Sequence, residues 1–540
     1  MRIGRVPTAL VLAGWMSRAE AAVPAEATVA DGLGGGNGAP GGDGTSAGAV
    51  RPRPAPPPAA LSALGLFQLR MTRSSVVTTN PFLDGQVVGA LGGINGTTTD
   101  LEDRSMLVEQ RADAFLTWAP PLLDGRASLT AGFEVDFAWG DQAYQTGGNK
   151  GGGFGADQVN LQTRRLHASF EPDLGGDDRL RLVAGLQFVA DGPHDPHQSG
   201  PDALFRHGGG LCFWGSEAAG LAGFGVVRGP RGDLLHTRLG GYSLVENGVA
   251  EADDVTLWMA DAEAHPAYAW DVAVHAWWLK DNSGGSGGTL GLGPTSQLSD
   301  MQGGPRLSVV AEDGTAAEVD ADLAWIGADV GYNRELAEGP VGFRGGGFLN
   351  AGRLYVTDQP DIDVFGWLAV LELRGRWAAG AGSEARIELL ATSPDDTRSD
   401  RYTGIVTGNS YGVAGAVWAT HGTLLLFSDP RAINRQVAVV ADVSNRGQGL
   451  LAITSSLGWD PVPDRLTLRG TAAHARRPDG GPLGTEVNGA ILGRPLPLLD
   501  LSLEAAVVMD ARIVDPTSQQ WTELPANPWA VILHTGWILL

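Results

Sequence analysis

The feature that most constrains this fold is a two-residue alternation of apolar and polar side chains, which recurs along most of the chain. Within residues 131–139 the apolar positions are Phe133, Val135, Phe137 and Trp139, and the carboxylates Glu134 and Asp136 stand between them. Side chains of a β-strand point alternately to its two faces. One face of this predicted strand is therefore apolar and ends in an aromatic ring, whereas the other carries two carboxylates.

The clearest predicted hairpin joins residues 160–171 to residues 179–190 through the turn 172–178. The first strand places Leu166, Ala168 and Phe170 on one face and Arg165, His167, Ser169 and Glu171 on the other. The second strand places Leu180, Leu182, Ala184, Leu186 and Phe188 opposite Arg179, Arg181, Val183, Gly185 and Gln187. The turn holds Pro, Asp and Gly, which tight reversals favour.

The alternation recurs toward the C-terminus, and the connections between alternating runs come in two sizes. Short turns such as 378–382 and 461–464 contrast with long polar connections at 140–157, 191–209, 281–305, 392–410 and 511–527. Residues 411–427 read as a hairpin that turns at 420–423. A barrel with short turns at one end and long loops at the other produces this contrast. We therefore predict an all-β fold, a single large antiparallel transmembrane β-barrel of about 18 strands, within a range of ~16 to ~20.

Composition separates a membrane barrel from a soluble β-protein. Lys occurs only at Lys150 and Lys280, so the predicted polar face combines Arg with Asp, Glu, Ser, Thr and Gln. That face suits a water-filled lumen, whereas a soluble sandwich exposes Lys-rich surfaces. The net charge of -23 argues against nucleic acid as a partner, because such binding needs an excess of Lys and Arg. The single cysteine, Cys212, excludes an intrachain disulfide.

Two N-terminal segments precede the predicted barrel. Residues 1–21 have a basic start, an apolar run over 6–16 and an A-x-A site at Ala19–Ala21, which predicts a secretory leader; a short amphipathic helix is the alternative. Residues 22–60 are rich in Gly, Ala and Pro and cannot bury enough apolar surface to offset chain entropy. We expect a disordered segment there and the barrel over residues 61–540. No later apolar run is long enough for a helical membrane span.

Tryptophans and the last segment give two further signs of a membrane barrel. Many tryptophans fall near the ends of apolar runs, as interfacial girdles would, although filling a core is the alternative: Trp118, Trp139, Trp258, Trp270, Trp277, Trp278, Trp325, Trp367, Trp377, Trp418, Trp459, Trp529 and Trp537. Residues 529–540 alternate to the final residue, and we expect them to form a closing strand that pairs with the first one.

The closing strand resembles the last strand of bacterial outer-membrane porins, which carries an assembly signal. Porins typically end in an aromatic residue, whereas this chain ends in Leu540, with Trp537 three residues earlier. Residues 483–489 and the strand around Arg164 and Arg165 are similar to the alginate-export-like group of porins. The resemblance implies a passive channel in the bacterial outer membrane without a cofactor. It also implies outer-membrane lipids, small polar solutes and the barrel-assembly machinery as partners.

Charged side chains on the predicted lumen face are the candidate solute-path residues. They are Arg165, Arg179, Arg181, Arg374, Arg376, Arg386, Arg465, Arg469, Glu134, Asp136, Glu372 and Glu388. The guanidinium groups could form a ladder that guides carboxylate or phosphate solutes. Alternatively, the mixed charges neutralise one another and hydrate the wall. Inward-folding loops at 140–157, 191–209 or 281–305 would narrow the passage.

Other kinds of site have weaker support in the sequence. His194, Asp195 and His197 offer metal donors, but Pro196 places them in a turn without further ligands, which favours a solvated loop. Gly215-Ser216 lacks the G-x-S-x-G frame, and no Walker loop or H-E-x-x-H motif occurs, so we do not expect an enzyme. Two alternatives stay open: a secreted soluble β-rich protein that binds or processes carbohydrate, and a structural barrel with a plugged lumen.

Overall fold

The computed structural model describes about three fifths of the chain in sections that begin at Ala60. These are residues 60–78, 97–99, 105–138, 160–189, 191–192, 216–229, 232–245, 254–284, 319–334, 336–380, 382–396, 400–406, 422–427, 429, 431, 433, 439–440, 443–445, 447–514, 521–523 and 527–539. The predicted leader, residues 22–59, Cys212, the His194–His197 stretch, loop 140–157 and most of loops 191–209 and 281–305 lie outside them.

The described strands form a closed antiparallel barrel of 18 strands, as the sequence predicts. In ring order the strands are β1 (Ala60–Ser74), β4 (Ser105–Ala119), β5 (Ala127–Ala138), β6 (Asn160–Phe170), β7 (Arg179–Val189), β8 (Ser216–Gly229), β9 (Gly232–Val245), β10 (Val255–Ala267), β11 (Trp270–Asp281), β12 (Val319–Tyr332), β13 (Val341–Val356), β14 (Ile362–Arg376), β15 (Glu384–Thr392), β17 (Leu450–Val462), β18 (Leu466–Arg476), β19 (Pro482–Leu496), β20 (Leu499–Met509) and β23 (Trp529–Leu539).

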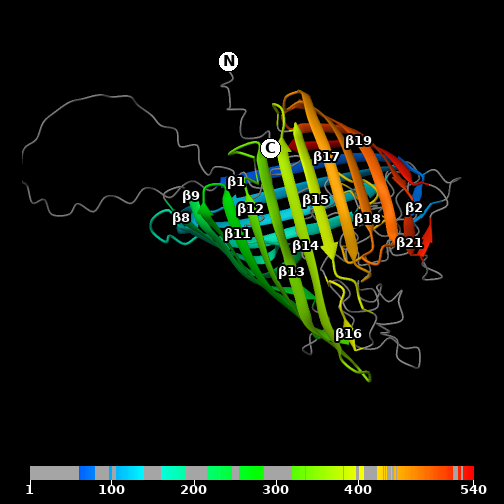
Figure 1. Cartoon of the computed structure of the whole chain (residues 1–540). Helices are drawn as coiled ribbons and strands as arrows, with labels where there is room; N and C mark the ends of the chain where they lie inside the picture. The colour runs from blue at the N-terminus through cyan, green and yellow to red at the C-terminus, as the bar shows by residue number, and fades with distance from the viewer. Residues whose placement is uncertain are drawn as a thin grey trace, which may run out of the picture.

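The first and last strands close the ring. β23 pairs antiparallel with β1 from Gly65 opposite Leu539 to Ser74 opposite Ala530, so the blue N-terminal strand lies beside the red C-terminal one (Figure 1). β1 pairs with β4 on its other side. Closure satisfies the backbone groups that an open sheet edge would leave bare, and a bilayer demands this of any sheet that spans it.

Shorter elements lie outside the ring. β16 (Arg401–Tyr402) pairs parallel with β14, and two small hairpins join β2 (Val76–Thr78) to β3 (Thr97–Thr99) and β21 (Arg512–Val514) to β22 (Trp521–Glu523). A 3-10 turn, η1, spans Leu122–Gly125. None of the helical segments in the described sections is long and apolar enough to cross a membrane.

Connections of two kinds define the two ends of the barrel. At one end, called the turn end, the strands are joined by 120–126, 171–178, 230–231, 268–269, 333–340, 377–383, 463–465 and 497–498, and β1 begins and β23 ends there. The other end, called the loop end, carries most of the long connections, including 393–449. The short turns predicted at 172–178, 378–382 and 461–464 all lie at the turn end.

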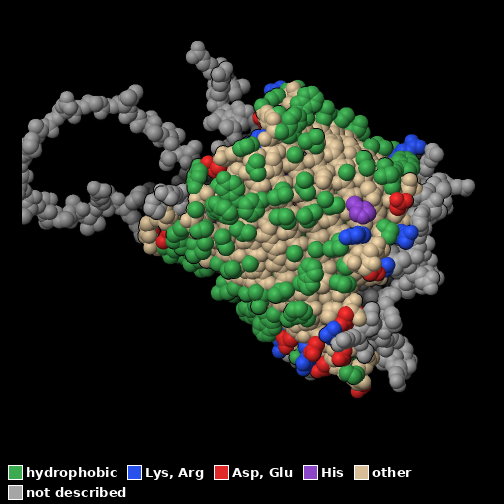
Figure 2. Space-filling view, in the orientation of Figure 1, with side chains coloured by type: hydrophobic (Ala, Val, Ile, Leu, Met, Phe, Trp, Pro, Cys, Tyr) green, Lys and Arg blue, Asp and Glu red, His purple; other side chains and the backbone are tan. Residues whose placement is uncertain are grey.

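The outer face of the barrel is apolar. Leu116, Phe133, Leu166 and Leu182 are exposed on successive strands β4 to β7, whereas Glu134 points inward and is buried. Figure 2 shows hydrophobic side chains spread over the outer surface, with charged ones mostly at its margins. The face that the sequence marks as apolar therefore points to the surroundings, which suits a lipid environment.

Most of the described tryptophans belong to this outer surface, but two do not. Trp118, Trp270, Trp377, Trp459 and Trp537 are exposed near the turn end. Nearer the loop end, Trp258 and Trp278 are exposed and lie opposite each other on β10 and β11. The prediction that tryptophans form interfacial girdles is wrong for Trp277 and Trp325. Both are buried, because their strand positions have the opposite parity and point inward.

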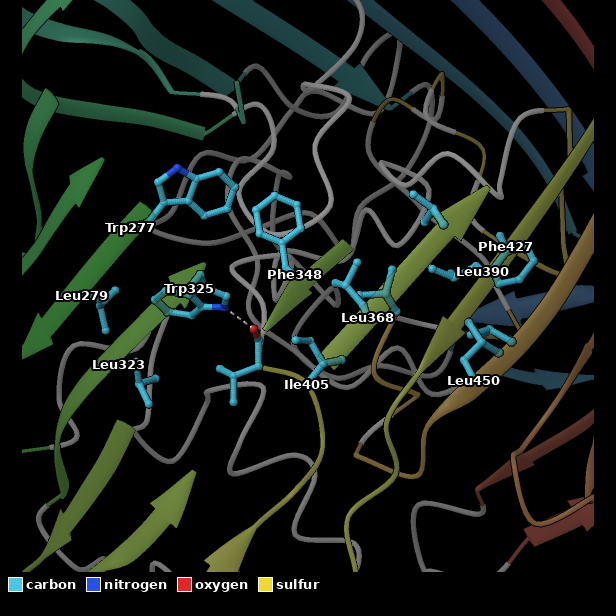
Figure 3. Packing of buried hydrophobic residues seen from close by; sticks show 14 of the residues in the cluster. Trp277, Leu279, Leu323, Trp325, Phe348, Leu368, Leu390, Ile405, Phe427 and Leu450 are labelled. Atoms are coloured by element: carbon cyan, nitrogen blue, oxygen red, sulfur yellow. Dashed lines mark hydrogen bonds between the residues drawn. The ribbon is translucent and has the colours of Figure 1, made fainter. Parts of the chain in front are cut away.

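Near the loop end, the interior beside β10 to β15 holds an apolar core. Trp277, Trp325 and Phe348 point inward from the neighbouring strands β11, β12 and β13, and the Trp277 and Phe348 ring centroids are 4.7 Å apart (Figure 3). Ile405 and Phe427, from the connection between β15 and β17, pack in the same cluster. Part of this long connection therefore folds into the barrel.

The predicted hairpin at 411–427 is not formed in its described part. Residues 422–427 have no strand structure apart from one isolated bridge, between Phe427 and Val440, and Leu424–Phe427 are buried. An apolar run can fill a barrel interior as well as cross a bilayer. Periodicity alone does not separate the two.

Candidate functional site

The candidate site is the inner face of the barrel, where paired charges tie neighbouring strands together. On β9 to β11, Arg238 Nε donates to Asp261 Oδ2 at 2.7 Å, and His275 Nδ1 lies 2.7 Å from Asp261 Oδ1. His275 Nε2 lies 2.9 Å from Asp329 Oδ2 on β12. Arg344 Nε on β13 donates to Asp329 Oδ1 at 3.1 Å. Each carboxylate has a basic group on both sides, so the charges compensate one another locally.

A second group of charges lies on β14 and β15. Glu372 is directly opposite Glu388, and Arg374 is directly opposite Arg386, so like charges face each other in register. Arg374 relieves this by donating from Nε and Nη2 to both oxygens of Glu384, at 2.7 and 2.9 Å. Arg386 lies 3.6 Å from Glu372 and 3.5 Å from Glu388. Diagonal pairing therefore offsets repulsion that would otherwise destabilise the two strands.

A third group lies on β4 to β6. Glu134 Oε1 and Oε2 lie 3.2 Å from Arg111 Nη2 and 3.4 Å from Arg164 Nε. The β5–β6 register shifts between Gly132 and Phe133, and this irregularity lets Arg164 and Arg165, although consecutive, both lie buried on the inner side.

Arg165 lies between two aromatic rings. Its guanidinium carbon is 5.1 Å from the centre of the Phe115 ring and 5.3 Å from that of Phe188. The sequence places Phe188 on the apolar outer face, and this prediction is wrong, since Phe188 is buried. The alternation in β7 breaks near Gly185, whose φ of 121° is a backbone conformation that side-chain-bearing residues rarely adopt. The two rings help to hold this cation within the wall.

Most of the charged side chains in these groups are shielded from water. Glu388 is 1% exposed, Glu134 2% and Arg238 3%. The sequence predicts hydrated charges along an open lumen, whereas in the structure many of these groups are buried and pair with one another. Burial of this extent in an 18-strand barrel means that chain folded inside covers the wall.

Part of the connection between β15 and β17 provides such cover and reaches opposite walls. At one wall, Trp325 Nε1 donates to the Val406 carbonyl at 2.8 Å, and Val406 N donates to Asn350 Oδ1 at 3.3 Å. At the other, Arg111 Nη2 donates to the Ile433 carbonyl at 3.1 Å. We call residues 422–433, of which 422–427, 429, 431 and 433 are described, the strap.

The two anchoring walls are diametrically opposed. In the ring of 18 strands, eight strands separate β1 from β12 in each direction: β4–β11 on one side, and β13–β15, β17–β20 and β23 on the other. Trp325 lies on β12, and on β1 Arg70 Nη1 donates to Asp429 Oδ2 of the strap at 2.7 Å. The described parts of the connection therefore extend across the full width of the interior.

The strap brings its own buried charge to the wall. Burial alone would raise the pKa of Asp429, but the Arg431 and Arg70 guanidinium groups outweigh this and hold the pKa below its ordinary value. Arg431 in turn donates from Nη1 and Nη2 to the two oxygens of Glu504 on β20, at 2.5 and 2.7 Å. The strap is thus attached by ion pairs to two strands.

The structure places the sequence-predicted residues in three kinds of location. Those on the inner wall are Arg165, Arg374, Arg386, Arg469, Glu134, Glu372 and Glu388. Four arginines lie at the turn end instead. Arg181 lies 4.0 Å from Glu171, and Arg376 donates to the Leu336 carbonyl. Arg179 and Arg465 are exposed. Asp136 lies opposite Arg111 in register, and its side chain is outside the description. The four charged residues of β14 and β15 are brought together, whereas Arg179 and Arg465 lie apart from them.

Sequence reasoning did not predict that a segment is attached inside the barrel. The residues that attach the strap are Arg70, Asp429, Arg431, Glu486 and Glu504. The signal that could have found the strap is the stretch after Phe427. Its Asp-Pro-Arg sequence follows the apolar run after a single serine and has no alternating strand directly after it. Such a stretch is a poor membrane strand, because Pro lacks the N–H that a ladder needs.

No group of three or more His, Cys, Asp or Glu side chains suited to a metal ion occurs within the described ranges. No protein-family model matches the chain, and no curated protein does. Solved structures do resemble it. Acinetobacter baumannii OccAB4 is 10% identical with a TM-score of 0.41, covering 88% of this chain and 98% of that one. Pseudomonas aeruginosa OccK5 (OpdH) has the same identity, coverages and TM-score.

An anion-selective porin from Comamonas acidovorans is 11% identical with a TM-score of 0.35, covering 89% of this chain and 100% of that one. Because the identities are low and the TM-scores lie below 0.5, the function of this chain has to be argued from its own residues.

Proposed function

We propose that this chain is a bacterial outer-membrane channel through which small polar or charged solutes pass down their concentration gradients. The observation that carries the proposal is the closed ring with an apolar outer face and a charged inner face. In a bilayer, only helices and closed barrels satisfy their backbone groups. A barrel of this size encloses room for an aqueous passage, whose selectivity the inner charges would tune.

The paired charges favour weak rather than strong ion selectivity. Arg374 and Arg386 are candidates for solute contact, but both are paired with Glu372 or Glu384. A wall of this kind offers hydrogen-bond donors and acceptors to a polar solute without a large field of one sign. The mixture supports local compensation over a purely basic ladder.

The outer surface argues against the soluble alternative. A secreted carbohydrate-binding protein would present its outward strand positions to water. Here those positions carry large apolar side chains such as Leu221, Leu239 and Ile326, each at least 66% exposed. Monomeric soluble proteins rarely expose apolar patches of such extent. The other alternative, a structural barrel with a plugged lumen, is distinguished from a channel by measuring conductance.

The test is conductance in planar bilayers, with protein purified in detergent and checked for heat-modifiable gel mobility. The unaltered protein should give discrete conductance steps. Arg374→Ala should shift the reversal potential in a salt gradient toward cation selectivity, because Glu384 loses its bidentate partner. Arg126→Ala is the matched control, since Arg126 pairs with Asp173 in exposed turns. Absence of conductance from every preparation would contradict the channel.

Three finer points of the proposal rest on sequence alone. Residues 1–21 would be removed on export and 22–60 would form a periplasmic segment, which N-terminal sequencing of the mature protein tests at Ala22. The closing strand, ending in Leu540, would be recognised by the barrel-assembly machinery. Membership of the alginate-export-like group rests on residues 483–489 and on Arg164 and Arg165.

A further inference from the structure

Charged side chains that face outward form a row near the loop end of β11 to β14, at positions of the same parity as the exposed apolar residues of these strands. Lys280 lies directly opposite Asp322 in register. Arg353 lies between Asp322 and Asp363, and its Nε is 2.9 Å from Asp363 Oδ1. Base and acid alternate along this row, so its charges compensate one another.

A second outward-facing charge, on β18, has no acid beside it. Arg476 is the last residue of β18 and is exposed, and its register partners are Leu451 on β17 and Pro482 on β19. Asp479 is the one acid of the turn that leads into β19, and it lies 3.0 Å from Arg477 instead. Within the part of the chain that the structure describes, Arg476 therefore has no counter-charge.

Two further polar groups face outward beside Arg476. His474 precedes it by two residues, so the two side chains share a face and start about 7 Å apart. Thr485 lies directly opposite His474 on β19, and its Oγ1 is 2.9 Å from His474 Nδ1. When the Thr485 hydroxyl donates this bond, the ring proton is on Nε2, which can donate to another acceptor. A guanidinium and an imidazole N–H thus stand together, and phosphate oxygens accept from both.

Apolar side chains flank this group on the outer surface. Ile453 lies directly opposite His474 on β17, Met509 lies opposite Thr485 on β20, and both are exposed. The group therefore stands at the margin of the apolar face. Basic side chains at such a margin extend toward lipid headgroups, whose phosphates supply the counter-charge. This location favours a phosphate carried by a lipid over one that is free in water.

We propose that Arg476 and His474, with Thr485, form a binding site for the phosphate group of a membrane lipid at the loop end of the barrel. The Arg476 guanidinium presents paired N–H donors to two phosphate oxygens, and His474 Nε2 donates to the same group. The acyl chains lie along the exposed apolar side chains of β17 to β20. The inference goes beyond the channel function, because it concerns the outer surface and applies to a conducting and a non-conducting barrel alike.

The test compares two lipids that differ only in the phosphate. The full-length protein in detergent is titrated with phosphatidic acid and with diacylglycerol of the same acyl chains, and bound lipid is counted by native mass spectrometry. The unaltered protein should bind phosphatidic acid more tightly. Arg476→Gln should weaken that binding on the order of tenfold, because one charge-assisted contact is lost. Arg353→Gln is the matched control: Arg353 is also outward-facing near the loop end but is paired with Asp363, so its loss should leave the affinity unchanged.

The outcomes separate the lipid site from its alternatives. Heat-modifiable mobility shows whether each variant is folded, and His474→Gln, which should also weaken phosphatidic acid binding, serves if Arg476→Gln does not fold. Equal affinity for the two lipids overturns the site, and so does an equal loss in Arg476→Gln and Arg353→Gln. Displacement of phosphatidic acid by an equimolar amount of inorganic phosphate overturns the assignment to a lipid. Absence of conductance with selective lipid binding intact contradicts the channel and leaves the lipid site.

Discussion

The orientation of the barrel wall makes a quantitative prediction at Leu503. This side chain is 47% exposed on the outer face of β20, and its register partners Ile491 and Leu533 are also exposed. β20 has 11 residues. At about 3.4 Å per residue and a tilt of about 45°, it rises roughly 26 Å, close to the height of the apolar band of such barrels. Leu503 is the fifth residue, so it lies roughly 10 Å inside the band, near the bilayer midplane.

An arginine at this position must place its charge in hydrocarbon. Leu503→Arg should therefore destabilise the folded barrel by about 2–4 kcal/mol, the cost measured for arginine near the midplane. Leu539→Arg is the matched control, because Leu539 is equally outward-facing but is the last residue of β23 at the turn end. Its cost should be about 0–1 kcal/mol. A difference of about 2 kcal/mol is roughly a 30-fold change in the folding equilibrium.

The assay is reversible unfolding by urea in phosphatidylcholine vesicles, followed by tryptophan fluorescence and by heat-modifiable gel mobility. Equal costs at the two positions would refute the argument that depth in a bilayer sets the penalty. Costs near zero at both would refute the membrane itself, because water would then solvate either arginine. A larger cost at Leu539 would mean that the apolar band is displaced along the barrel.

Three further predictions concern the interior. Arg386→Ala should destabilise the barrel by about 3–5 kcal/mol in the same urea assay, because it removes the cation that lies 3.6 Å from the buried Glu372 and 3.5 Å from the buried Glu388; a cost below about 1 kcal/mol would contradict the ion-pair network. Trp277→Ala should cost about 3–5 kcal/mol by emptying the apolar cluster, measured as a shift of the urea midpoint. The pKa of Asp429 is lowered on folding, so its stabilising contribution is complete above the unfolded value of about 4 and is lost as the pH falls below it. At pH values below ~4, the temperature at which heating changes the gel mobility should therefore decrease, and it should decrease less in Asp429→Asn. An identical decrease in both proteins would rule out this cause.

Much of the wall could be predicted from sequence because alternation reports directly on which face each side chain occupies. The hairpin of β6 and β7 has the predicted turn, and Leu166 and Leu182 point outward as expected. The prediction failed where local geometry departs from a regular strand. At Gly185 the alternation breaks and Phe188 turns inward, and the irregularity opposite Gly132 brings both Arg164 and Arg165 inside. A period of two cannot reveal such departures.

The candidate site was less predictable than the wall. Glu372, Arg374, Arg386 and Glu388 were expected on the inner face and lie there, but their partners could not be assigned without the β14–β15 register. The strap was missed altogether, because the apolar residues that bury it in the interior have the same composition as residues that face lipid. Trp277 and Trp325 show the same ambiguity.

The sequence by itself determined the all-β fold class, the regular parts of the strands and the apolar outer surface. Each of these follows from the alternation of apolar and polar side chains with a period of two residues. Only the tertiary structure decided what fills the barrel. The contacts of Glu486 with residues 424–426, and of Arg431 with Glu504, join residues about sixty and about seventy positions apart in the chain. No local pattern specifies them, since the barrel first has to form before its wall strands β19 and β20 can meet this distant segment of the chain.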